Sequence, residues 1–280
     1  MNCLLVINTL SGNASKIREE ELIEKYAEGS SVTVKYIRDR EDTYSVDGVD
    51  RLIVCGGDGT LNHALNICRE KEIDIYYLPF GTFNETAKGT HGSGVCSLAK
   101  MGSIRDVDFA YVAAAGSFTG IGQSPSARSK RRFKIFAYFF KVLAAYKVHR
   151  ISAEIKSERF SASGTYTLIM ASNAVRCFGF RFNHLYRDNS DELQLLLIKA
   201  PKKDNLWGRI AMFFPFFRAL FLGFRKEHFG KRITFLSLKN ATLSLAEETP
   251  FCVDGECRTF GGELPLSKQT HKARIFLIKE

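Results

Sequence analysis

A run of apolar residues that passes directly into a glycine-rich turn constrains the fold most. Residues 51–55 are typical of a buried strand, the GGDGT sequence at 56–60 follows at once, and residues 61–70 have helical character. Glycines there let backbone N–H groups approach phosphate oxygens, and the helix N-terminus adds partial positive charge. Asp58 alone would repel phosphate, so it favours a site in which Mg²⁺ bridges carboxylate and phosphates. An ordinary Gly-Asp-Gly turn is the alternative.

Apolar strands alternate with helical segments over roughly the first third of the chain. We expect helices at 15–28 and 61–70 and strands at 4–7, 32–37, 51–55 and 75–78. Such alternation predicts an α/β fold with a parallel sheet. About a dozen residues join the second and third strands, which is near the minimum for a parallel crossover, so we expect no full helix there.

From about residue 110 the pattern changes to short alternating segments, which predicts a mostly antiparallel β domain. We expect its strands at 150–155, 164–172, 193–198, 232–238, 241–245 and 273–278. The chain therefore divides into a nucleotide-binding domain at 1–112 and a β-rich substrate domain at 113–280. Whether the C-terminal strand returns to the first domain is left open.

Two more motifs accompany the glycine-rich turn. LPFGTFNE at 78–85 follows the next strand, and VDGE at 253–256 lies near the end of the chain. In this order the three motifs resemble the diacylglycerol kinase catalytic family, which includes sphingosine kinases and bacterial soluble lipid kinases and is distantly related to NAD kinase and phosphofructokinase. The resemblance implies an NAD kinase/phosphofructokinase-like α/β domain with a parallel sheet, followed by a mostly antiparallel, β-sandwich-like domain.

The resemblance also assigns roles to residues of this chain. Glu256 falls at the position of the proton acceptor, Asp254 would assist it or orient the metal, and Asp58 would face Mg²⁺. A substrate hydroxyl loses its proton as it attacks the γ-phosphoryl group, so the chemistry needs such a base. The residues implied to bind ATP are Asn8, Ser11, Gly12, Gly56, Gly57, Asp58, Gly59, Thr60, Gly81, Thr82 and Asn84.

Several positions depart from the family pattern. Thr9 replaces a proline of the first loop, His63 stands where a glutamate is frequent, and Glu85 replaces an aspartate. The family also carries a DGxLD-like segment with an aspartate at a structural Mg²⁺ site. Residues 188–194 (DNSDELQ) lack its glycine and final acid, which leaves Asp191 as the candidate ligand.

By resemblance, the chain is an ATP- and Mg²⁺-dependent kinase that phosphorylates a lipid hydroxyl, with conversion of diacylglycerol to phosphatidic acid favoured. One alternative is a kinase of the same superfamily acting on a soluble substrate such as NAD. Another is a non-catalytic relative that binds nucleotide or lipid, which His63 and the irregular segment at 188–194 favour. Asp58 and Glu256 argue against that second alternative.

Positive charge and aromatic residues favour phosphate or an anionic membrane as partner, and an ordinary solvated basic face is the alternative. The formal net charge is +10, and no acid occurs between Asp108 and Glu154. Two aromatic segments with basic residues, 131–148 and 206–226, suit a membrane interface, although one face of each is expected to pack on the β domain. No nucleic-acid-binding signature is found, and a homodimer is left open.

Cysteine use and the apolar pattern indicate the compartment. The chain has seven cysteines, an odd number without CxxC spacing, which favours reduced thiols over disulfides or a zinc site. We expect no signal peptide, because the first residues carry no basic leader, and no stretch reaches the roughly 20 apolar residues of a membrane span. We therefore expect a cytoplasmic protein that associates peripherally with membranes.

Overall fold

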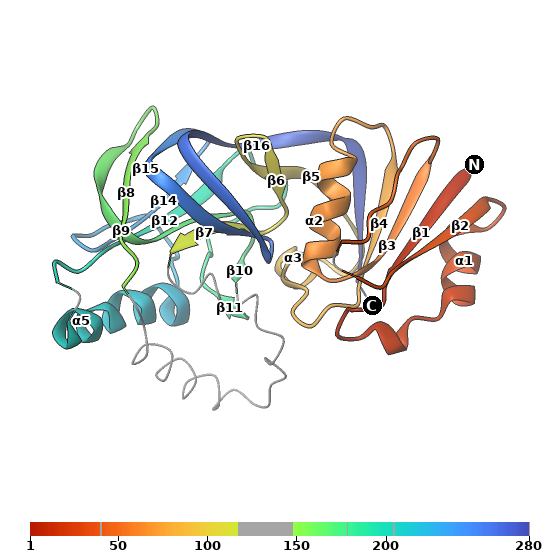
Figure 1. The fold of residues 1–280 in the computed structure, drawn as a ribbon, viewed down its shortest axis with the longest axis horizontal. Coiled ribbons are helices and arrows are strands. Elements are labelled where there is room, and N and C mark those ends of the chain that lie inside the picture. The colour runs from red at the N-terminus through yellow and green to blue at the C-terminus, as the bar shows by residue number, and fades with distance from the viewer. Residues whose placement is uncertain (40, 117–147, 178, 204, 280) are drawn as a thin grey trace.

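The structure is a computed structural model that describes residues 1–39, 41–116, 148–177, 179–203 and 205–279. Most strands belong to one fourteen-stranded sheet, and β10 (Arg176–Cys177) pairs separately with β11 (Phe180–Arg181). Figure 1 shows that this sheet runs through two parts of the molecule that lie side by side. The segment expected at 131–148 lies, except for Val148, outside the described residues.

Strands and helices alternate in the N-terminal part. In chain order they are β1 (Asn2–Asn8), η1 (Ala14–Lys16), α1 (Glu19–Ala27), β2 (Ser31–Ile37), β3 (Arg51–Gly56), α2 (Asp58–Ile67), β4 (Asp74–Pro79) and α3 (Glu85–Gly89). β1 pairs in parallel with β2 and β3, and β3 pairs in parallel with β4. The carboxyl ends of β1, β3 and β4 therefore meet at one edge of the sheet, where ligands of such sheets bind.

Antiparallel pairing dominates the rest of the chain. Its strands are β5 (Gly94–Ile104), β6 (Val107–Phe109), β7 (Val112–Gly116), β8 (Ile151–Lys156), β9 (Ser161–Ser172), β12 (Leu193–Lys199), β13 (His228–Phe229), β14 (Ile233–Leu238), β15 (Asn240–Val253) and β16 (Glu256–Lys279). Helix α5 (Leu206–Phe217) continues into a π-helical turn, η3 (Arg218–Leu222).

Strand β16 connects the two parts. It begins beside β15, with Glu256 opposite Val253, and its last residues pair in parallel with β4 and antiparallel with β5. The C-terminal strand thus returns to the N-terminal part, as Figure 1 shows. Because the sheet is continuous across residue 112, the division at that position stays a prediction.

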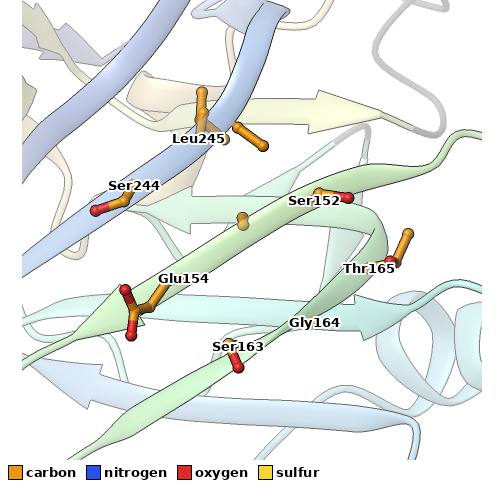
Figure 2. A pocket seen from close by; sticks show the side chains of 9 residues that line it. Ser152, Glu154, Ser163, Gly164, Thr165, Ser244 and Leu245 are labelled. Atoms are coloured by element: carbon orange, nitrogen blue, oxygen red, sulfur yellow. The ribbon is translucent and has the colours of Figure 1, made fainter.

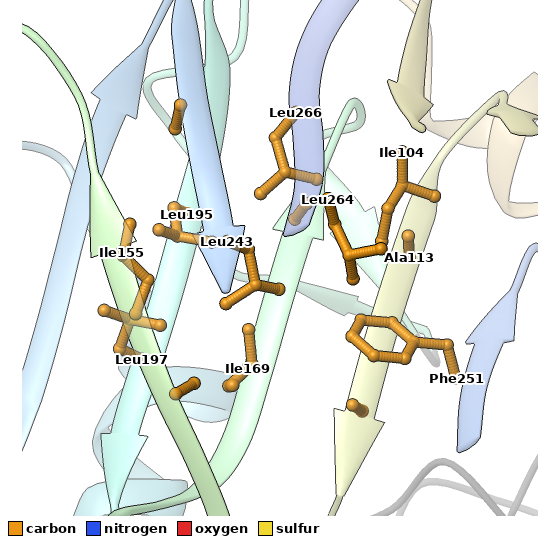
Figure 3. Packing of buried hydrophobic residues seen from close by; sticks show 14 of the residues in the cluster. Ile104, Ala113, Ile155, Ile169, Leu195, Leu197, Leu243, Phe251, Leu264 and Leu266 are labelled. Atoms are coloured by element: carbon orange, nitrogen blue, oxygen red, sulfur yellow. The ribbon is translucent and has the colours of Figure 1, made fainter. Parts of the chain in front are cut away.

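Separate hydrophobic cores hold the two parts. In the C-terminal part, alternate residues of several strands point to a common interior, as Figure 3 shows for Leu195, Leu243 and Leu264. In the N-terminal part, α2 buries Leu61 and Leu65 against the strands. The loops that carry the sequence motifs are therefore attached to rigid elements.

Some boundaries differ from those that the pattern predicts. α2 begins at Asp58 rather than after the glycine-rich turn, so residues 58–60 form its first turn. The helix expected from residue 15 begins at Glu19. Strands β5, β6 and β7 were not predicted, because residues 94–116 contain glycines and lack a sustained alternation of apolar and polar residues. No helix joins β2 to β3 in the described residues there, as expected.

Candidate active site

Three loops, which follow β1, β3 and β4, contact one another at the edge of the parallel strands. The Asn8 side chain at the end of β1 donates a 2.7 Å hydrogen bond from Nδ2 to Thr60 Oγ1 in α2. Asn13 Nδ2 donates to the carbonyl of Gly81 at 2.8 Å, and Phe80 N donates to the Gly56 carbonyl at 2.8 Å. The structure thus brings together the motifs that the sequence places far apart.

Glycines permit the close approach of these loops. A Cβ on Gly81 would lie 2.5 Å from Gly57 Cα, so the two backbones leave no room for a side chain at Gly81. A Cβ on Gly12 would lie 2.3 Å from Thr82 Oγ1, which places the first loop against the third. Ser11 lies in the turn after β1, where its N–H donates to the Asn8 carbonyl at 3.2 Å.

Asn84 shapes the third loop. Its backbone is left-handed (φ 52°), and Nδ2 donates to the carbonyls of Pro79 at 2.7 Å and Gly81 at 3.0 Å. Its Oδ1 is buried without a hydrogen-bond partner among the described residues. That oxygen is thus available to accept a hydrogen bond from a donor group of a bound ligand.

Asp58 is buried and already bonded. Its carboxylate accepts hydrogen bonds from the backbone N–H groups of Glu85 at 2.9 Å and Thr86 at 3.0 Å, at the start of α3. Burial raises the pKa of Asp58, and these amides oppose the rise. Its two oxygens therefore fix α3 against α2, while the Mg²⁺ role that we expected from the sequence stays a prediction.

Glu256 lies against the glycine-rich turn. It follows the two-residue turn between β15 and β16, in which Asp254 and Gly255 have φ of 50° and 98°, the sign pattern of a type I′ hairpin. A Cβ built on Gly59 would lie 2.7 Å from Glu256 Oε1. The exposed Glu256 carboxylate is thus brought to the first turn of α2, whose N–H groups lack intrahelical partners.

Asp254 is a structural anchor. It is 1 % exposed and accepts four hydrogen bonds, which come from the backbone of residues 110–112 and, at 3.1 Å, from Asn62 Nδ2. All its oxygens face protein donors, so the carboxylate joins the β15–β16 turn to α2 and to the start of β7. If Asp254 assists Glu256 as expected, it would do so by holding the turn that carries Glu256 in place.

Buried carboxyl groups gather behind the loops. Burial raises the pKa of Glu85 to about 7, with Arg176 opposing and Asp58 reinforcing the rise. Burial also raises the pKa of Asp254 to about 7, against three backbone hydrogen bonds and with a further rise from Asp58. Asp58, Glu85 and Asp254 therefore share one negative field, which favours cationic or hydrogen-bond-donating groups nearby.

Glu85 has a structural role that the sequence did not predict, since it was identified there only as a departure from the family pattern. Its Oε1 accepts a 2.7 Å hydrogen bond from Gly179 N, and Oε2 lies 3.6 Å from Arg176 Nε. Glu85 therefore ties α3 to the β10–β11 hairpin. No local pattern could have shown this, because the partners are more than ninety residues away.

His63 lies one helical turn after Gly59 on α2. Its ring contacts Tyr44 edge-on at 5.1 Å between ring centroids. Burial and Arg258 lower its pKa, while the charge of Glu256 opposes them. This departure from the family pattern therefore lies within electrostatic reach of the candidate base.

Asp191 does not join this cluster. It lies on the loop before β12, is largely exposed, and forms an ion pair with Lys100 on β5. In the part of the chain that the structure describes, no three His, Cys, Asp or Glu side chains are grouped to hold a metal ion.

Two surface depressions help to locate the site. One of about 460 Å³ adjoins the third loop and is lined by Pro79, Asn84, Lys88 and Lys279 among others. The other, of about 600 Å³, lies on β8, β9 and β15 and is lined by small or polar residues such as Ser152 and Thr165 (Figure 2). Only the first contains a motif residue, so the second is not part of the candidate site.

An exposed apolar face is present on α5. Trp207, Ile210 and Phe214 are 77 %, 48 % and 69 % exposed, and their spacing puts them on one side of the helix. The opposite side buries Met212 and Phe216 in the core, as expected for this segment. Among the described helices, none is long and apolar enough to cross a membrane.

The family and two relatives that this chain resembles carry the name diacylglycerol kinase. Residues 2–112 match the family described as diacylglycerol kinase catalytic domain. The diacylglycerol kinase of Staphylococcus carnosus (strain TM300) is 25 % identical over 243 residues, which cover 81 % of this chain and 75 % of the relative. The diacylglycerol kinase of Bacillus subtilis (strain 168) is 23 % identical over 235 residues, covering 77 % and 73 %.

A solved structure shares the fold. The crystal structure of a diacylglycerol kinase from Bacillus anthracis str. Sterne superposes with a TM-score of 0.65 at 16 % identity, covering 100 % of this chain and 97 % of that one.

Proposed function

We propose that this chain transfers the γ-phosphoryl group of ATP to a lipid hydroxyl, because residues 2–112 match the diacylglycerol kinase catalytic domain. Its relatives named diacylglycerol kinase favour diacylglycerol as acceptor and phosphatidic acid as product. The reaction needs a phosphate cradle, a base for the hydroxyl proton and access to lipid.

The contact between Glu256 and Gly59 carries the proposal. Through it, the one exposed acid of the β15–β16 turn lies beside the turn that would hold the phosphates. In the proposed step, a Glu256 oxygen accepts the hydroxyl proton, the hydroxyl oxygen bonds to the γ-phosphorus, and the bond from that phosphorus to the bridging oxygen of ADP breaks.

The loops would hold ATP mainly through backbone groups. N–H groups at the start of α2 and the Thr82 hydroxyl would donate to the phosphates, while Asn84 Oδ1 would accept a hydrogen bond from a donor group of the nucleotide. Mg²⁺ would neutralise phosphate charge. The Asp58 oxygens are buried and accept two amide hydrogen bonds, so they fit poorly as direct metal ligands, and we assign no step to a metal held by Asp58.

Lipid access is proposed through α5, which replaces the broader expectation at 206–226. The exposed Trp207, Ile210 and Phe214 would enter the headgroup region of an anionic membrane. The basic residues Lys202, Lys203, Arg225 and Lys226 are exposed near the two ends of the segment formed by α5 and η3. Their charge complements anionic lipid. The protein would then contact the membrane with the end of the molecule that carries α5.

The test is transfer of label from γ-labelled ATP to lipids in mixed micelles. The panel contains diacylglycerol, ceramide and a sphingoid base, with soluble NAD as an additional acceptor. Glu256→Gln removes the base and is expected to lower the rate by a factor of about 10² or more. Glu263→Gln makes the same change in charge at an exposed position of the same strand and is expected to leave the rate unchanged.

The outcomes separate the competing functions. Label on diacylglycerol that disappears with Glu256→Gln supports the proposal, whereas label on NAD would identify a soluble acceptor. If the wild-type protein binds Mg·ATP but labels no acceptor, the chain is a non-catalytic nucleotide-binding relative.

A further inference from the structure

The acidic segment at 188–192 is the place where the family resemblance implies a structural Mg²⁺. A hard divalent cation needs several oxygen ligands that are not used elsewhere. Here the Asp191 carboxylate forms an ion pair with the Lys100 ammonium. The candidate metal ligand Asp191 is thus already paired with a cation that belongs to the protein, the Lys100 ammonium.

A second ammonium lies close to the same acids. Lys268 Nζ is 5.1 Å from the centroid of the Tyr186 ring, and it is buried without a hydrogen-bond partner among the described residues. The charges of Asp188, Asp191 and Glu192 act on it. Burial lowers its pKa to about 8, so Lys268 still carries most of its charge at neutral pH.

Two further side chains hold the segment in place, although Asp188 Oδ1 is buried without a hydrogen-bond partner among the described residues. Asp188 Oδ2 accepts a 3.1 Å hydrogen bond from the His91 backbone N–H and lies 2.9 Å from His91 Nδ1. Asn189 Oδ1 accepts a 2.8 Å hydrogen bond from Ala99 N on β5. The segment is therefore attached to β5 and to the loop before it by the same side chains that would have to bind a metal.

The two lysines come from neighbouring strands. β5 pairs antiparallel with β16 in a register that sets Lys268 opposite Gly102 and Lys100 opposite Thr270. Lys100 and Lys268 are thus diagonal neighbours across the strand pair that connects the two parts of the molecule. The acidic segment meets this pair from the C-terminal part.

We propose that Lys100 and Lys268 are built-in counter-ions of the acidic segment, which therefore keeps its place against β5 and β16 without a bound metal. The ammonium groups neutralise Asp191 and its neighbours, and a divalent cation would have to displace the Lys100–Asp191 pair. This inference concerns stability and does not depend on the reaction proposed above.

The test is thermal unfolding of the full chain without nucleotide, in EDTA and in rising concentrations of MgCl₂. The wild-type Tm is expected to be the same in both. The variant with Lys100→Met and Lys268→Met leaves the acids without counter-ions, so Mg²⁺ is expected to raise its Tm by about 2–4 °C. Adding Asp191→Asn should abolish that rise.

Lys272→Met is the matched control, because Lys272 lies on the same strand in an exposed ion pair with Glu70. It should show no response to Mg²⁺. A wild-type Tm that rises with Mg²⁺ and loses the rise on Asp191→Asn would overturn the inference, and so would a double variant that ignores Mg²⁺. If the double variant does not fold, Lys100→Met alone is measured by the same criteria.

Discussion

At the scale of single residues, the candidate site depends on glycines where two loops touch. Gly81 faces Gly57 so closely that any Cβ would meet both the Gly57 backbone and Asn84 Oδ1, and the backbone cannot move aside as a side chain can. We expect Gly81→Ala to lower the free energy of unfolding by about 1–3 kcal/mol, the usual effect of overpacking. Urea denaturation measures the change, and Mg·ATP binding should weaken with it.

Gly261→Ala is the matched control for this prediction. Its Cβ would lie 3.2 Å from Glu248 Cγ, which belongs to a flexible exposed side chain. We expect a smaller loss of stability and unchanged nucleotide binding. Equal losses for the two variants would show that the contact between Gly81 and Gly57 has no special importance.

Lys268 gives the stability a pH dependence of known sign. Burial brings its folded-state pKa to about 8, below the ordinary value of 10.5. Between these values the unfolded chain binds more protons at this group, so its contribution to stability rises with pH. We expect the free energy of unfolding of wild type, minus that of Lys268→Met, to increase from about pH 8 to 10.5.

Taking the difference between the two proteins removes the contribution of other titrating groups. The acids around Lys268 stay ionised in this range, and Lys100 is the other cation that acts on it. A flat difference measured by urea denaturation across the range would mean that the lysine is not buried in solution.

At this scale the sequence allowed some roles to be predicted and others not. Gly57 was predicted from the chemistry of phosphate binding, whereas Asn84 and Glu256 were predicted from the resemblance to the kinase family, and the structure brings all three to one edge. The partners of Asp58 and Asp254 could not be predicted, because hydrogen bonds to distant backbone leave no periodic signal. The site assignments themselves await the kinase assay.

At the scale of elements, the β15–β16 turn fixes the candidate base. Asp254 uses both oxygens to accept hydrogen bonds from residues 110–112 and Asn62, which attaches the turn to β7 and α2. Asp254→Asn replaces one acceptor oxygen by a donor, so at least one buried N–H loses its partner. We expect the free energy of unfolding at pH 8 to fall by about 1–3 kcal/mol for each N–H left unpaired.

Asp106→Asn is the control, because this aspartate is exposed and close in sequence to the same strands. It should change the stability little. If Asp254→Asn is as stable as wild type while phosphate transfer is lost, the side chain acts in the chemistry rather than in positioning Glu256.

Elements with strong periodicity were predicted well. β1, β3 and β4 are nearly continuous apolar runs because the sheet is covered on both faces, and they lie within two residues of their expected bounds. β5 was not predicted, since its pairing with β16 is set by contacts across the chain rather than by its own pattern, which includes Gly102 and polar residues. The start of α2 was placed too late because glycines suggested a loop.

At the scale of the whole molecule, the strand β16 connects the candidate site to the part of the chain that carries α5. β16 carries Glu256 at its first residue and pairs with β4 near its end, so it couples the candidate base to the parallel strands that hold the loops. Helix α5 lies in the C-terminal part, on the far side from the N-terminal strands (Figure 1). Membrane binding and phosphate binding should therefore be separable by mutation.

The exposed aromatic side chains of α5 allow membrane binding to be changed by itself. Trp207→Ser with Phe214→Ser removes the two most exposed aromatic side chains of α5 without touching its buried side. Co-sedimentation with anionic vesicles should fall about tenfold or more, because burying such side chains contributes about 1.5–3 kcal/mol each. Val95→Ser, at a 60 % exposed apolar position of β5, is the control and should bind vesicles as wild type does.

Activity then distinguishes docking from chemistry. On a short-chain, water-soluble diacylglycerol, the α5 variant should match wild type, since the loops and Glu256 are unchanged. On vesicles, the phosphorylation rate of the variant should fall together with its vesicle binding. Added salt should also weaken the vesicle binding of the wild-type protein, because salt screens the charges of the basic residues near α5, which are Lys202, Lys203, Arg225 and Lys226. Unchanged vesicle binding by the α5 variant would place the membrane contact elsewhere on the molecule.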